Sequence, residues 1–86
     1  MAAIRILVVD DAQVVRKRLC LMLAAHPEIL VVAEASSGSE AIEKAKQYQP
    51  DVVLLDIAMP ELNGIQAAPL QKNVAPQTEI LIATQL

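Results

Sequence analysis

Four short apolar runs, separated by longer segments of mixed character, constrain the fold of this chain more than any other feature. The runs cover residues 4–9, 30–33, 52–55 and 79–84. They are rich in Val, Ile and Leu and are almost uninterrupted by polar residues, which is typical of parallel strands buried on both faces of a sheet. We therefore predict four strands at these positions.

The segments between the runs have helical spacing. Residues 12–25 and 39–49 each place apolar side chains on one stripe, as expected of helices that cover a sheet. The positions expected to face inward are Val15, Leu19, Met22 and Leu23 in the first helix and Ala41, Ile42, Ala45 and Tyr48 in the second. Residues 64–73 form a weaker third helix, which Pro69 should kink or shorten because proline lacks an N–H donor.

Strands that alternate with helices predict an α/β fold, a doubly wound parallel sheet with helices on both faces. The chain has 86 residues, which suits a single domain. The sequence thus predicts four strands and three helices in one domain.

Composition excludes several classes of function. The net charge is −3 and the longest basic run is residues 16–18, so a nucleic-acid surface is not expected. The longest apolar run, residues 19–25, is far too short to cross a bilayer, so we expect a cytoplasmic protein. One Cys and one His exclude an internal disulfide and a zinc set, and two glycines exclude nucleotide-binding loops of the dinucleotide and phosphate-loop types.

Acidic residues follow two of the predicted strands. Asp10 and Asp11 end the first, and Asp56 ends the third. If these strands are neighbours, three carboxylates converge at the carboxyl edge of the sheet, where ligands of such folds bind. Like charges this close favour either protonation or a shared divalent cation, and carboxylate oxygens suit Mg²⁺. One carboxylate could then accept a phosphoryl group, with the Thr84 hydroxyl as a donor to it.

Each of these residues also has an ordinary structural interpretation. Asp10 and Asp11 could cap the following helix, and Thr84 could be an ordinary strand residue because threonine is common in strands. Asp56 has less reason to be a cap, because a loop follows it. A phosphatase of the haloacid dehalogenase type would need Asp-x-Asp after the first strand, and the third residue here is Ala12.

Four motifs together resemble the receiver domain of bacterial two-component response regulators. They are VVDD at residues 8–11, PDVVLLD at 50–56, MP at 59–60 with NG at 63–64, and the strand at 80–84. The resemblance spans residues 4–84 and implies a flavodoxin-like sheet with strand order 2-1-3-4. Residues 26–35 further resemble the subgroup whose output module is a helix-turn-helix DNA-binding domain.

The resemblance implies a role for each motif residue. Asp56 is the phosphoacceptor, and Asp10, Asp11, Asp56 and the backbone carbonyl of Ala58 hold Mg²⁺. Thr84 is the switch hydroxyl. The partner is a sensor histidine kinase, whose phosphohistidine is the donor. Such a domain is not an enzyme beyond its own phosphotransfer and dephosphorylation.

The sequence departs from the family after the fourth strand. Residues 1–86 are therefore predicted to be an incomplete receiver domain, with DNA contacted only through a missing output domain. The family's fifth-strand lysine is absent, so we expect phosphorylation to be slow or lost. An unpaired fourth strand and an uncovered sheet face predict self-association, as a dimer. The alternative function is a structural module that binds itself and transfers no phosphoryl group.

Overall fold

The computed structural model describes residues 3–56 and 78–83 of the chain. The elements are β1 (Ile4–Val9), α1 (Gln13–Ala24), β2 (Ile29–Ala35), α2 (Gly38–Tyr48), β3 (Val52–Asp56) and β4 (Glu79–Ala83). All four predicted strands and the first two predicted helices are confirmed, although β2 is longer than the predicted run at 30–33. The predicted helix at 64–73, with its proline kink, lies outside the described residues.

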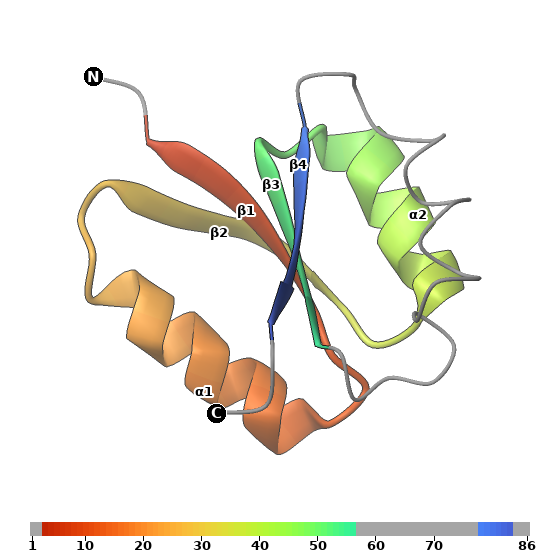
Figure 1. The fold of residues 1–86 in the computed structure, drawn as a ribbon, viewed down its shortest axis with the longest axis horizontal. Coiled ribbons are helices and arrows are strands. Elements are labelled where there is room, and N and C mark those ends of the chain that lie inside the picture. The colour runs from red at the N-terminus through yellow and green to blue at the C-terminus, as the bar shows by residue number, and fades with distance from the viewer. Residues whose placement is uncertain (1–2, 57–77, 84–86) are drawn as a thin grey trace.

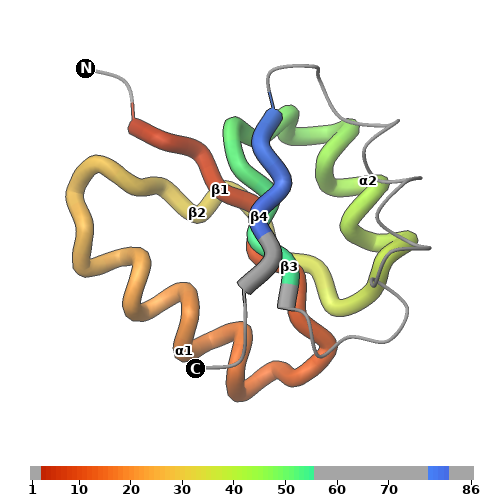
Figure 2. The backbone as a smooth tube through the Cα atoms, in the orientation of Figure 1, coloured from red at the N-terminus to blue at the C-terminus, as the bar shows by residue number. Residues whose placement is uncertain are grey.

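The strands form one parallel sheet in the order β2-β1-β3-β4, which confirms the predicted order. The two described helices lie on opposite faces of this sheet (Figure 1). Strand pairing places β1 and β3 in the middle of the sheet and β2 and β4 at its edges, and β4 crosses in front of the central strands in the view of Figure 2. The carboxyl ends of β1, β3 and β4 therefore meet at one edge of the sheet.

The best-packed core lies between the sheet and α2. Alternate residues of the central strands point to this face because side chains alternate along a strand. They pack against small residues of α2, which let the helix approach closely. The buried cluster consists of Leu7, Val9, Ala35, Ala41, Ala45, Val53 and Leu55, with Ala33, Ile42 and Ile80 packed against it. The predicted inner face of the second helix is confirmed at Ala41 and Ala45, which are buried, and at Ile42 and Tyr48, which are half-buried.

Side-chain hydrogen bonds begin α2. The Ser37 hydroxyl accepts from the Glu40 amide at 3.2 Å, which satisfies one of the unpaired N–H groups of the first turn. Glu40 Oε1 in turn accepts from the amide and the hydroxyl of Ser36 at 2.7 and 2.9 Å. The Ser36 amide, followed by its hydroxyl, lowers the pKa of Glu40 because both donate to the charged form.

The carboxyl end of α2 depends on a left-handed residue and a distant arginine. Gln49 caps the helix with φ 45°, and Pro50 follows it. The guanidinium of Arg5 donates to the carbonyls of Tyr48 and Gln49 at 2.7 and 2.9 Å. The start of β1 is therefore tied to the end of α2, where carbonyl groups lack helical partners.

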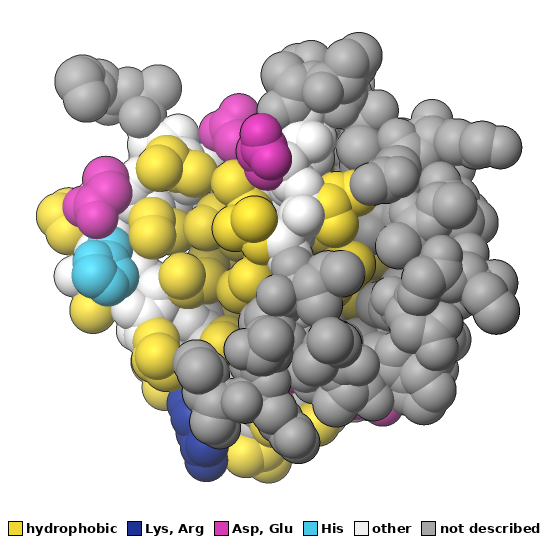
Figure 3. Space-filling model, in the orientation of Figure 1, with side chains coloured by type: hydrophobic (Ala, Val, Ile, Leu, Met, Phe, Trp, Pro, Cys, Tyr) yellow, Lys and Arg dark blue, Asp and Glu magenta, His cyan; other side chains and the backbone are white. Residues whose placement is uncertain are grey.

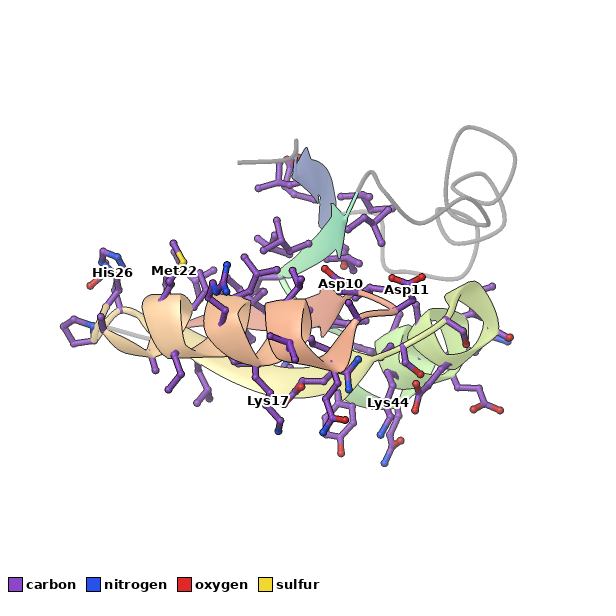
Figure 4. All side chains as sticks on the ribbon, turned by 90° about the horizontal axis from the view of Figure 1, so that it is seen from below. Asp10, Asp11, Lys17, Met22, His26 and Lys44 are labelled. Atoms are coloured by element: carbon purple, nitrogen blue, oxygen red, sulfur yellow. The ribbon has the colours of Figure 1, made fainter. Side chains whose placement is uncertain are left out.

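Helix α1 packs less completely than the sequence predicts. None of its residues is buried. Leu19 and Leu23 are half-buried as expected, but the prediction is wrong for Val15 and Met22, which are exposed. In the described part of the chain α1 packs on β2 and β1. Met22 lies on the side of the helix that faces β3 and β4 (Figure 4), and it is 54% exposed.

The sheet and the adjoining side of α1 present an apolar surface that we call the uncovered face, defined by Ile4 of β1, Met22 of α1 and Leu81 of β4. Hydrophobic side chains gather there, with acidic side chains and a histidine at the rim (Figure 3). Leu81 of β4 is 52% exposed and Ile4 of β1 is 44% exposed. Leu81 is the register partner of Leu54, which is half-buried on the same face. Exposed apolar patches of this kind are common at interaction surfaces.

Candidate functional site

The strand register brings the two predicted acidic positions together. Val9 of β1 pairs with Leu55 of β3, so Asp10 and Asp56 are the next residues on two adjacent parallel strands. Asp56 is also the register partner of Ala83, at the end of β4. The backbone thus confirms that the first and third strands are neighbours, on which the predicted convergence of carboxylates depends.

Asp10 is buried and hydrogen-bonded at this edge. The residue is 0% exposed. Its amide donates to the carbonyl of Ala35 at 3.0 Å, which extends the pairing of β1 with β2. Its Oδ1 accepts from the amide of Ala12 at 2.9 Å, the hydrogen bond of an Asx turn. Asp11 is exposed beside it, where the chain turns into α1 (Figure 4).

The structure also tests whether the aspartate pair caps α1. The N-cap residue is Ala12, no side chain caps the helix, and its first turn contains no acidic residue. Asp10 therefore shapes the turn before the helix, and Asp11 has no capping hydrogen bond to the helix. The capping interpretation of this pair is wrong, since the helix begins after both aspartates.

An arginine that the sequence analysis did not select borders the acidic edge. Arg16 Nη1 donates to the main-chain carbonyl of Asp10 at 2.8 Å, and Arg16 Nε donates to Glu34 Oε1 at 3.0 Å. The Lys17 ammonium lies 3.8 Å from Glu34 Oε2. Arg16 lies one turn into a polar-faced helix, where an exposed basic residue is ordinary, so no sequence signal marked its contact with the strand.

Other members of the predicted site lie partly or wholly outside the described residues. Ala58 and Thr84 are outside them, and for Asp56 only the backbone is described. Among the side chains that are described, no group of three His, Cys, Asp or Glu residues is placed to hold a metal ion. The roles predicted for Asp56, Ala58 and Thr84 therefore stay predictions.

The donor chemistry of the edge fits Mg²⁺. A buried aspartate, its exposed neighbour and a third aspartate at the same level of the next strand supply only hard oxygen donors. Mg²⁺ is held in proteins by one or two carboxylates together with water and phosphate oxygens. Asp10 and Asp11 would hold the ion, with Asp56 as the third acidic group.

A parallel sheet in the order 2-1-3-4 with aspartates following two adjacent strands at its carboxyl edge is a flavodoxin-like arrangement. Residues 6–86 match the response regulator receiver domain family, and the chain belongs to that family. Within the described residues, neither helix has the length and apolarity needed to span a membrane.

Relatives of known description share this domain. The transcriptional regulatory protein LnrK of Bacillus subtilis is 41% identical over 81 residues, which is 94% of this chain and 37% of that protein. A protein-glutamate methylesterase/protein-glutamine glutaminase of Methanosarcina acetivorans is 41% identical over 80 residues, 93% of this chain and 23% of that protein. The chain thus spans well under half the length of these relatives.

Solved structures agree with the fold. The response regulator domain of Thermotoga maritima CheB matches with a TM-score of 0.81 and 41% identity, covering 98% of this chain and 62% of that one. A LuxR-family two-component response regulator from Aurantimonas matches with a TM-score of 0.85 and 30% identity, covering 99% and 61%. These likenesses confirm the predicted flavodoxin-like receiver fold.

Proposed function

We propose that this chain is a cytoplasmic phosphoacceptor module that takes a phosphoryl group onto Asp56 from a sensor histidine kinase. The observation that carries this proposal is the register between β1 and β3, which sets Asp10 and Asp56 at one level of adjacent strands. Membership of the receiver family supports it. We also propose that the output module of the whole protein is a helix-turn-helix DNA-binding domain, in keeping with the transcriptional regulator among the relatives.

In the proposed reaction, a carboxylate oxygen of Asp56 attacks phosphorus and forms an acyl phosphate. The bond from phosphorus to the histidine nitrogen breaks, and that nitrogen keeps the electron pair. Mg²⁺, when bound, offsets the negative charge of the transferred oxygens. Asp10 and Asp11 would hold the ion with the backbone carbonyl of Ala58 as a further ligand, and the Thr84 hydroxyl would donate to a phosphoryl oxygen.

Incubation with Mg²⁺ and acetyl phosphate, followed by intact mass spectrometry, tests the proposal. We expect one phosphoryl group to be added slowly, in keeping with the impaired reaction that the sequence predicts, and neutral hydroxylamine should remove it because hydroxylamine cleaves acyl phosphates. Asp56→Asn should abolish the adduct. Asp51→Asn is the matched control, since Asp51 is an exposed aspartate before the opposite end of β3. An unmodified wild-type chain, or equal labelling of the Asp56→Asn variant, would contradict the proposal.

A second candidate function is self-association without phosphotransfer, in which two copies form a dimer. The uncovered face favours it, because Ile4, Met22 and Leu81 are large hydrophobic residues that are 44%, 54% and 52% exposed. β4 is also the last strand of the described sheet, and edge strands offer unpaired backbone groups to another chain.

Sedimentation velocity at micromolar concentrations tests this candidate. A dimer that is indifferent to Mg²⁺ and to Asp56→Asn is expected. Leu81→Lys should dissociate it, whereas Leu21→Lys should not, because Leu21 lines the groove between α1 and β2, away from the uncovered face. A monomer at every concentration rules the dimer out.

A further inference from the structure

We propose that Arg16 is a positioning residue for the acidic edge, an inference that rests on the proposed function. By donating to the main-chain carbonyl of Asp10, Arg16 holds the turn from Asp10 to Ala12 in the geometry that presents the carboxylates to a divalent cation. Arg16 would act on the cation only through Asp10, since its guanidinium donates to the main-chain carbonyl of that residue.

The hydrogen bonds around the turn form a closed arrangement. Asp10 Oδ1 accepts from the Ala12 amide at 2.9 Å, while the Ala12 carbonyl accepts from the Arg16 amide at 2.9 Å. The Arg16 guanidinium then returns to the Asp10 carbonyl at 2.8 Å. The side chain of Arg16 therefore bonds to the first residue of the turn and its backbone amide bonds to the last. Rotation of the Asp10 carboxylate would break its own hydrogen bond to the Ala12 amide.

Glu34 fixes the direction of the guanidinium. Its Oε1 accepts from Arg16 Nε at 3.0 Å, and the Arg16 side chain is only 15% exposed. Glu34 lies on β2 as the register partner of Val8, two residues before Asp10 on β1. A planar guanidinium with two bonds from different nitrogens has one orientation, which a lysine at this position would not reproduce.

The charge of Arg16 and its positioning role predict opposite effects of its removal on Mg²⁺ affinity. A guanidinium beside a cation site repels the cation, so removing it should tighten Mg²⁺ binding if Arg16 acts only through its charge. If Arg16 positions Asp10, its removal should weaken binding, because partners that orient metal ligands are typically worth about 10- to 100-fold in affinity. The sign of the change therefore separates the two roles.

The first experiment needs no metal. Hydrogen exchange of the Ala12 amide, followed by NMR without Mg²⁺, reports the Asx turn directly. Arg16→Ala should speed this exchange by about fivefold, the factor that one hydrogen bond of ordinary net strength represents. The amide of Val53 in β3 serves as the reference for global opening. The exposed Arg18 on the same helix gives the control variant Arg18→Ala, which should leave Ala12 unchanged.

The second experiment is Mg²⁺ titration calorimetry of the same chains. We expect affinity to fall about tenfold in Arg16→Ala, to fall less in Arg16→Lys, and to stay constant in Arg18→Ala. Unchanged Ala12 exchange, or Mg²⁺ affinity in Arg16→Ala that equals or exceeds that of the wild type, overturns the positioning role. A wild-type chain that binds no Mg²⁺ overturns the proposed function instead, and Ala12 exchange then decides the part played by Arg16.

Discussion

Val9 of β1 and Leu55 of β3 are partners in the parallel ladder, so the residues that follow them, Asp10 and Asp56, stand at one level of adjacent strands. The hydrogen bonds between β1 and β3 alone set this relationship, so it does not depend on the conformation of the loops at the edge of the sheet. If the carboxylates of Asp10 and Asp56 converge as the sequence predicts, their repulsion favours a shared cation. The stability of the chain should therefore depend on Mg²⁺.

Mg²⁺ should raise the melting temperature of the wild-type chain, and a chelator should reverse the rise. At a concentration 100 times the dissociation constant, binding adds about 2.7 kcal/mol, or a shift on the order of 10 °C for a domain of this size. Asp10→Asn should remove most of the shift. Differential scanning calorimetry with and without Mg²⁺ measures the shift in melting temperature. The buffers contain no Ca²⁺, so that no other divalent cation occupies the site. An equal shift in Asp10→Asn would show that Mg²⁺ binds elsewhere.

Glu40 should make the start of α2 sensitive to acid. Donation from Ser36 lowers the pKa of Glu40 in the folded chain. The stabilisation is therefore complete above the ordinary pKa of a glutamate and is lost as the pH falls through the lowered folded value. Urea unfolding of wild type and Glu40→Gln should show a gap in free energy at neutral pH that closes in acid.

The control for this titration is Glu43→Gln, at an exposed position of the same helix. Its free-energy gap from the wild type should be smaller at neutral pH. A gap for Glu40→Gln that is constant from neutral to acid pH would mean that the carboxylate contributes nothing through its charge.

Replacement of Gln49 by glycine should raise the free energy of unfolding. Its φ of 45° lies in the left-handed region, which costs a residue with a Cβ atom about 1 kcal/mol or more. Part of this gain is offset by the greater freedom of glycine in the unfolded chain, so Gln49→Gly should stabilise by about 0.5 kcal/mol. Gln47→Gly, inside α2, should destabilise by up to about 1 kcal/mol. Chemical denaturation measures both, and a loss of stability in Gln49→Gly would contradict the expectation.

The sequence predicted the sheet well because its strands are buried and nearly continuous in apolar residues. The strand order followed from the family resemblance, and the paired ends of β1 and β3 then brought Asp10 and Asp56 to one edge as expected. The second helix was predicted to end at residue 49 and ends at Tyr48, but nothing in the local sequence indicated that Gln49 would take a left-handed conformation.

The predictions that failed depend on contacts between distant segments. Helical spacing marked Met22 as an inward residue, yet burial requires a partner on that side of α1, and periodicity alone does not supply one. Arg16 was missed for a related reason. Its two acceptors come from β1 and β2, and only the folded chain brings the Asp10 carbonyl and the Glu34 carboxylate to the same side chain.

Cys20 should react slowly with alkylating reagents in the folded chain. Burial raises the pKa of its thiol, and the neighbouring carboxylate of Glu34 raises it further by charge and by a hydrogen bond. Because the thiolate is the reactive form, iodoacetamide at neutral pH should modify folded Cys20 more slowly than the unfolded chain.

Glu34→Gln should accelerate the reaction by about threefold, since it removes the repulsive charge and leaves Lys17 and Arg16 free to stabilise the thiolate. Glu43→Gln is again the control, and denaturant should abolish the difference between all three chains. Alkylation followed over pH by mass spectrometry separates a change in pKa from a change in access: a lowered pKa moves the midpoint of the rate profile, whereas greater access raises the plateau. A profile with the same midpoint in wild type and Glu34→Gln would rule out the electrostatic role of Glu34.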